Sequence, residues 1–166
     1  MDEREWSETE GAMSWRDEVD AVMAQANAAA SEQEQAAADK RDQISHNHEQ
    51  ATAVLRGPIA EGIESLRAVL EPQGVPFFVS ERQFARPPHR EHVGFEIEMT
   101  RPGRSPYLCE ILAHYRGDDV RFTLCRADLH QPEPFPARPA DITAERVAEA
   151  LWRAYRQSLD REQPTP

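Results

Sequence analysis

This chain of 166 residues has few of the residue types on which a functional assignment usually rests. It has two cysteines, Cys109 and Cys125, and a single lysine, Lys40. No apolar run is long enough for a membrane-spanning helix, and the acidic start MDEREWSETE lacks the basic region of a secretory signal. We therefore expect a cytoplasmic protein of a GC-rich bacterium. Two cysteines in that compartment carry no presumption of a disulfide.

Signature motifs of catalysis are also missing. The sequence contains no glycine-rich phosphate loop, no nucleophile elbow and no paired-cysteine zinc motif. The formal net charge of −11 disfavours nucleic acid and anionic membranes as partners, because both carry negative charge. The acidity is uneven, since residues 1–57 carry a net charge of −8 and residues 58–166 a net charge of −3. We expect no cofactor.

Residues 12–56 contain neither proline nor glycine, and this permits one long helix. Apolar residues recur there at helical steps of three and four, after Ser14 as a possible N-cap. This stripe comprises Trp15, Val19, Val22, Ala26 and Ala29. Further on, a seven-residue repeat of Ala30, Ala37, Ile44 and Ala51 alternates with the polar Gln33, Lys40 and Asn47. We expect a flexible acidic tail at 1–12 and a helical arm at 13–56. The arm is a solvated single helix, a self-association element or a docking element.

The dipeptide Gly57-Pro58 interrupts the helical pattern, so either a second helix begins there or one helix is kinked. An apolar helical stripe continues to Leu70, and Gly74 ends it. Residues 57–160 are expected to form the head domain, followed by a frayed tail at 161–166. The predicted fold class is α+β: a long N-terminal helical arm, then a head of helix, four-stranded antiparallel meander and helix.

The four strands are predicted from a two-residue alternation of apolar and polar side chains. They cover residues 75–84, 91–100, 106–116 and 119–126. A proline-rich stretch, 131–140, is expected to be an extended, solvated connection. The closing helix begins after Thr143, where Ile142 and Val147 are placed to form a hydrophobic staple, and it runs to about Leu159.

Strand register decides whether the two cysteines meet. A two-residue loop at Gly117-Asp118 pairs Tyr115 with Val120, and every apolar residue of the two strands then lies on one face. This register places Cys109 and Cys125 on opposite faces of the sheet, so we expect no disulfide and no shared metal.

The opposite face of the predicted sheet collects polar groups. His92 and His114 lie at one end, and Glu96 and Glu110 are opposite each other in the middle. All four residues are candidates for an acid–base site, and the two histidines are also candidates for a metal site. Two leucines, Leu108 and Leu112, are on the same face, which also suits a docked partner. A solvated face, a partner-binding face and a chemical site remain as alternatives.

A basic loop, RQFARPPHR at 82–90, offers Arg82, Arg86 and Arg90 to an anion or an acidic partner. Two hypotheses follow. The first is a non-enzymatic interaction or oligomerisation module that associates through the arm, with Trp15, Val19 and Val22 as contact residues. Its sheet face (Leu108, Leu112) or basic loop would then bind a protein partner. The second is a small metal-binding protein or enzyme that uses the His/Glu cluster.

Overall fold

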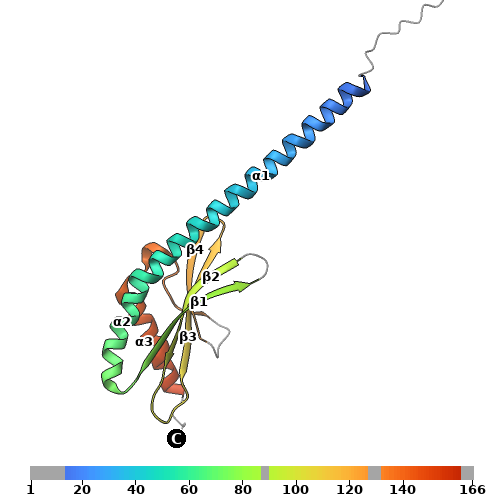
Figure 1. The fold of residues 1–166 in the computed structure, drawn as a ribbon. Coiled ribbons are helices and arrows are strands. Elements are labelled where there is room, and N and C mark those ends of the chain that lie inside the picture. Colours follow the sequence, from blue (N-terminus) through green and yellow to red (C-terminus); the bar gives the residue numbers. More distant parts are fainter. Residues whose placement is uncertain (1–13, 87–89, 127–131, 162–166) are drawn as a thin grey trace, which may run out of the picture. The chain divides into compact units, whose positions relative to one another are not determined.

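The computed structural model describes residues 14–86, 90–126 and 132–161, without the side chains of 82–86, 90–92, 116, 132, 133 and 161. Its backbone confirms the α+β class, with a long N-terminal helix, an antiparallel sheet and a C-terminal helix (Figure 1). The chain divides into two compact units, Met1–Asp42 and Gln43–Pro166. The expected flexible tail at 1–12 lies outside the described residues.

Helix α1 spans Trp15–Val54. Ser14 caps it as predicted, since its Oγ accepts a hydrogen bond from the Arg16 N–H at 3.4 Å. Two acidic residues, Asp17 and Glu18, occupy the first turn, where the positive end of the helix dipole favours them. Every residue from 14 to 42 is exposed.

The last turns of α1 belong to the head unit. Asn47 and Ala51 are buried there, together with Leu55 just beyond the helix end. The sequence predicts that the head begins at residue 57, at the Gly-Pro break; the second compact unit begins at Gln43 and so includes the last turns of α1. The reason is physical: Asn47 and Ala51 are buried in the head, although Asn47 is polar and precedes the Gly-Pro break.

The Gly57-Pro58 break is a kink within one helical run. A π-helical turn at Leu55–Ile59 joins α1 directly to α2, Ala60–Leu70. Pro58 has no backbone N–H to donate and its ring crowds the preceding turn, which accounts for the kink. Gly57 has a non-helical conformation there, with φ −95° and ψ −112°.

The described part of the chain forms a five-stranded sheet in the order β1-β2-β3-β4-β5. Each strand is antiparallel to its neighbour. The strands are β1 Phe77–Arg86, β2 Arg90–Met99, β3 Tyr107–Arg116, β4 Asp119–Arg126 and β5 Pro132–Glu133. The predicted registers are confirmed, since Tyr115 pairs with Val120 and Glu96 with Glu110.

The hydrophobic core lies between one face of the sheet and the helices α2 and α3, the latter spanning Ala144–Arg161 (Figure 1). Thr143 caps α3 through a 3.3 Å bond from the Arg146 N–H, as expected. Gly62 lets α2 approach α3 closely, because a Cβ at this position would lie 2.5 Å from the Ala144 carbonyl oxygen. The largest fully buried core side chains include Phe122, Ile59, Ile63, Ile97, Ile111, Leu124 and Leu151.

The proline-rich connection is more ordered than expected. Its residues Pro132–Glu133 pair with β4 as β5, and the Ala137 carbonyl accepts a hydrogen bond from the Phe122 N–H at 2.8 Å. Phe135 packs against the core and is half-buried. The segment therefore covers the outer edge of β4 and is not merely a solvated link. Prolines are compatible with this role because an edge strand does not need every backbone N–H to donate a hydrogen bond to a neighbouring strand.

Candidate functional site

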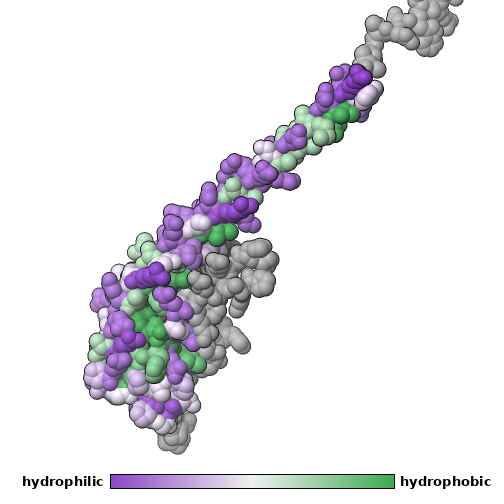
Figure 2. Space-filling model, in the orientation of Figure 1, coloured by the Kyte–Doolittle hydropathy of each residue, from purple (hydrophilic) through white to green (hydrophobic). Residues whose placement is uncertain are grey.

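The exposed face of α1 is the first candidate. Trp15, Val19 and Val22, predicted as contact residues, are 68%, 49% and 57% exposed, and Met23 beside them is 54% exposed. Figure 2 shows this hydrophobic surface among polar residues on the N-terminal part of the helix. Within the helix these positions repeat at steps of three and four residues, so they share one face.

That face is wider than a two-position coiled-coil seam. Met23, Ala30 and Ala37 lie next to the three-and-four row, so all three positions are apolar in the heptad from Val22, and two of the three are apolar in each of the next two heptads. Alanines bring helix backbones close together but bury little area each. The large side chains are concentrated near Trp15, and the face becomes small and polar toward Lys40.

The open face of the sheet carries the predicted acidic row. Glu96 is paired with Glu110, which is paired in turn with Cys125. All three are half-buried. Two like charges directly opposite are unfavourable by about 0.2–1 kcal/mol. Leu108 lies opposite Glu98, one row away, and is also half-buried.

The predicted meeting of His92 and His114 lies beyond the paired part of β2 and β3, which ends at Gly94 and Leu112. The side chain of His92 is outside the described residues. His114 Nε2 lies 2.8 Å from the Thr123 hydroxyl oxygen. Among the described residues, no three histidine, cysteine or acidic side chains gather as a metal site would require.

Leu112 covers the backbone of Gly94. A Cβ at Gly94 would collide with the Ile111 carbonyl oxygen and would lie 2.8 Å from Cδ2 of Leu112. Phe78 of the edge strand β1 is paired with Glu98 of β2 and is 61% exposed on this face. The open face is therefore a mixed surface of half-buried leucines and carboxylates.

The basic loop falls largely outside the described residues. Arg82 and Arg86 are placed near the end of β1 and Arg90 at the start of β2, but nothing is described of their side chains. Their role as a partner-binding cluster remains a prediction.

The two cysteines do not meet. Both are free, and Cys109 pairs with Arg126 while Cys125 pairs with Glu110, as predicted from the register. Cys109 is fully buried, and this burial raises the pKa of its thiol to about 12. A thiol with that pKa is a poor nucleophile and a poor metal ligand near neutral pH.

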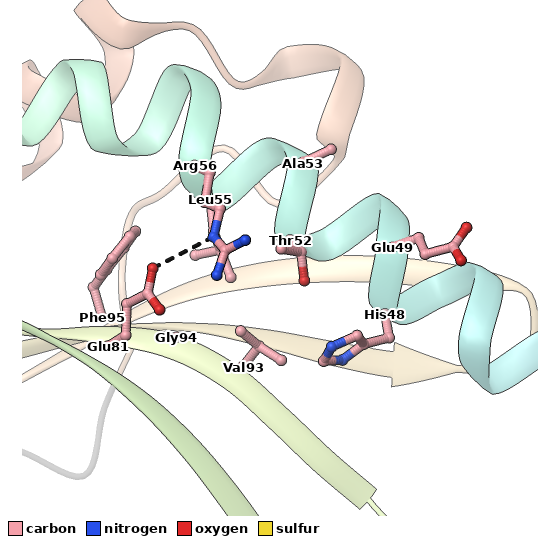
Figure 3. Close-up of a pocket in the computed structure, with 10 residues that line it drawn as sticks. All are labelled: His48, Glu49, Thr52, Ala53, Leu55, Arg56, Glu81, Val93, Gly94 and Phe95. Carbon is pink, nitrogen blue, oxygen red and sulfur yellow. Dashed lines mark ion pairs between the residues drawn. The ribbon is translucent and has the colours of Figure 1, made fainter.

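A pocket of about 490 Å³ lies within the head between the end of α1 and strands β1 and β2 (Figure 3). At one end the Arg56 Nε and Glu81 Oε1 atoms form an ion pair at 3.5 Å. At the other end His48 Nδ1 lies 3.3 Å from the Tyr115 hydroxyl oxygen. Between them, the Thr52 hydroxyl is buried and has no hydrogen-bond partner among the described residues.

The lining of this pocket is partly apolar and partly ionisable. Its floor is formed by Val93, Gly94 and Phe95, and Figure 3 shows the Thr52 hydroxyl directed toward the sheet. Such a lining suits a small apolar molecule with one hydrogen-bonding group. The ionisable side chains of the lining are His48, Glu49, Arg56 and Glu81; His48 contacts the Tyr115 hydroxyl, and Arg56 pairs with Glu81.

A second pocket, of about 580 Å³, is an open groove between α2 and α3. Its base consists of Leu66 and Leu70, which are buried, while Val69 and Trp152 are exposed by 62% and 40%. The sequence does not predict this groove, because helix periodicity identifies the buried stripe but not the gap beside it.

The fold and these surfaces define an α+β protein with a long N-terminal helix, two free cysteines and several half-apolar surfaces. No protein-family model, curated protein or solved structure matches the chain. Within the described residues, no helix is both long and apolar enough to cross a membrane.

Proposed function

We propose that this chain is a non-enzymatic interaction protein that associates with a second copy of itself through the exposed face of α1. The observation that carries the proposal is the stripe of Trp15, Val19, Val22 and Met23, which are 49–68% exposed on a fully exposed stretch of helix. A helix normally gains most of its stability by packing an apolar face. A second copy of the same helix offers a matching face.

Rough energetics favour a reversible complex. Burying a large apolar side chain contributes about 1.5–3 kcal/mol when it starts fully exposed. Side chains that begin about half exposed gain less, so the stripes of two helices together contribute on the order of 10 kcal/mol. Association costs about 4–15 kcal/mol. The two quantities are close, so the complex should depend strongly on protein concentration.

Charge works against the association at low salt. Residues 1–57 carry a net charge of −8, so two copies brought together repel each other. Added salt screens this repulsion while leaving the apolar contact intact or stronger. Association through the stripe should therefore increase with salt.

In this proposal the head is the part that binds a partner protein, through the open sheet face with Leu108 and Leu112 or through the basic loop. An adaptor of this kind joins two copies of one partner. We place it in the cytosol, which agrees with two cysteines that stay free.

A charge placed on or off the stripe tests the proposal. Val22→Asp puts a carboxylate in the apolar face, while Ala24→Asp puts the same charge two residues away, on a different face of the helix. Light scattering after size exclusion should show loss of association for Val22→Asp and retention for Ala24→Asp. Equal behaviour of the two variants would remove the stripe from the proposal.

A further inference from the structure

The groove between α2 and α3 carries unpaired negative charge. Its charged lining residues are Glu145 and Glu149, and neither makes an ion pair within the described residues. The nearby Arg67 is engaged elsewhere, at 2.7 Å from Glu64 and 3.6 Å from Glu71. The groove is thus apolar at its base and negative at one side.

The geometry of the two helices explains why the groove stays open. Gly62 brings α2 into contact with the Ala144 carbonyl at the start of α3. The groove is formed by the turns that follow, residues 65–70 and 145–152. Rigid helices therefore form both walls, and Leu66 and Leu70 are held at the base by the core. A preformed groove of this kind loses little entropy when a ligand binds.

We infer that this groove binds an amphipathic helix of a partner protein whose polar face is basic. An apolar groove between two helices is a common receptor for such a helix, which inserts anchors spaced at three, four and seven residues. Lysine or arginine beside the anchors would face Glu145 and Glu149. The volume of about 580 Å³ accommodates a few large apolar side chains.

Charge argues against occupation by this chain's own helix. The exposed segment of α1, residues 15–42, carries seven acidic and three basic residues. Its carboxylates would meet Glu145 and Glu149 without compensation. The groove and the α1 stripe are consequently two separate surfaces with different occupants, and the inference does not depend on the proposed self-association.

The probe for the test is a fluorescein-labelled peptide of about 18 residues, or five helical turns, with leucine on one face and lysine on the other. Two reference peptides are needed: the same pattern with glutamate in place of lysine, and a scrambled leucine–lysine peptide without an apolar face. Fluorescence anisotropy is measured with the full-length protein at about 0.15 M salt. The patterned leucine–lysine peptide should bind at least about tenfold more tightly than either reference.

The matched variants are Val69→Arg and Phe78→Arg. Both replace an exposed apolar residue of the head with the same positive charge, but only Val69 lines the groove. Val69→Arg should weaken binding at least about tenfold and Phe78→Arg less than about twofold. A second variant, Glu145→Gln with Glu149→Gln, should weaken binding relative to Glu32→Gln with Glu34→Gln on α1.

Three outcomes would overturn the inference. They are equal weakening by the two arginine variants, equal binding of the patterned and scrambled peptides, and binding of the glutamate peptide at the same affinity. The first two would mean that the overall negative charge of the protein, and not the groove, attracts the probe. The third would mean that Glu145 and Glu149 do not select a basic helix. Circular dichroism of every variant confirms that the fold is retained.

Discussion

The side-chain amide of Asn47 donates a hydrogen bond to the Gly117 carbonyl oxygen at 2.8 Å, across 70 residues of sequence. Asn47 is 1% exposed, and its own oxygen accepts a bond from Gln43 Nε2 at 3.0 Å. This polar side chain therefore fastens the end of α1 to the hairpin between β3 and β4. Gly117 has a positive φ of 64° at that turn, a conformation that favours glycine.

Asn47→Ala should lower the free energy of unfolding by about 1–2 kcal/mol, because the bond is lost and a small cavity remains. The matched control is Asn27→Ala on the exposed part of α1, which should be neutral or slightly stabilising because alanine is the better helix former. Urea denaturation of both variants measures the difference. Equal stability of the two would show that the Asn47 contact contributes nothing.

Gly62→Ala should destabilise the head by about 2 kcal/mol or more, since the new Cβ would lie 2.6 Å from the Val147 Cβ and force α2 away from α3. Helix propensity alone predicts that this substitution would stabilise the protein by about 1 kcal/mol. Ser65→Ala, one turn later on an exposed position, is the control and should change little. A higher melting temperature for Gly62→Ala would refute the close packing of the two helices.

The two thiols should differ in reactivity. Ellman's reagent should modify the half-buried Cys125 in the native protein and reach the buried Cys109 only after denaturant is added. Modification of both thiols at the same rate in the native state would contradict the burial of Cys109.

Alkaline pH should weaken the fold through Cys109. Burial raises its pKa from 9.0 to about 12, so the unfolded chain loses this proton first as pH rises. The contribution of Cys109 to the free energy of unfolding is therefore complete below pH 9. It is lost between pH 9 and 12, by up to about 1.4 kcal/mol per pH unit. The decline should be shallower in Cys109→Ala, and an identical decline would contradict the assigned cause.

The acidic row on the open sheet face offers another test. Glu110→Gln should stabilise the protein by about 0.2–1 kcal/mol, because it removes the charge directly opposite Glu96. Glu98→Gln, opposite Leu108, is the control and should change stability less.

The metal-site alternative predicts a different result. Zn²⁺ would raise the melting temperature of the wild type, and Glu110→Gln or His114→Ala would abolish the rise.

The alternation of side chains made much of the sheet predictable. Because the loop at Gly117-Asp118 is short, only one register places Tyr115 and Val120 on the same face as the other apolar residues, and that register is observed. The separation of Cys109 from Cys125 follows from it. The caps at Ser14 and Thr143 were recognisable because their signals are local.

What escaped prediction depends on tertiary contact. In the sequence, Asn47 is a polar residue that interrupts an apolar helical stripe. Its burial is explained only by the hydrogen bond to Gly117. The pairing of Pro132 with Cys125 escaped notice because proline rarely marks a strand. The groove beside Val69 and Trp152 depends on how closely two helices approach, and no periodicity within either helix encodes that distance.

Sedimentation equilibrium of the full-length protein over a wide concentration range, at low and at high salt, tests the central claim most directly. The chain mass is 18.9 kDa. We predict an average mass that exceeds this value, rises with concentration, increases with salt, and returns to the monomer value in Val22→Asp. A constant mass of 18.9 kDa for the wild type at the highest concentration and high salt would contradict association through α1.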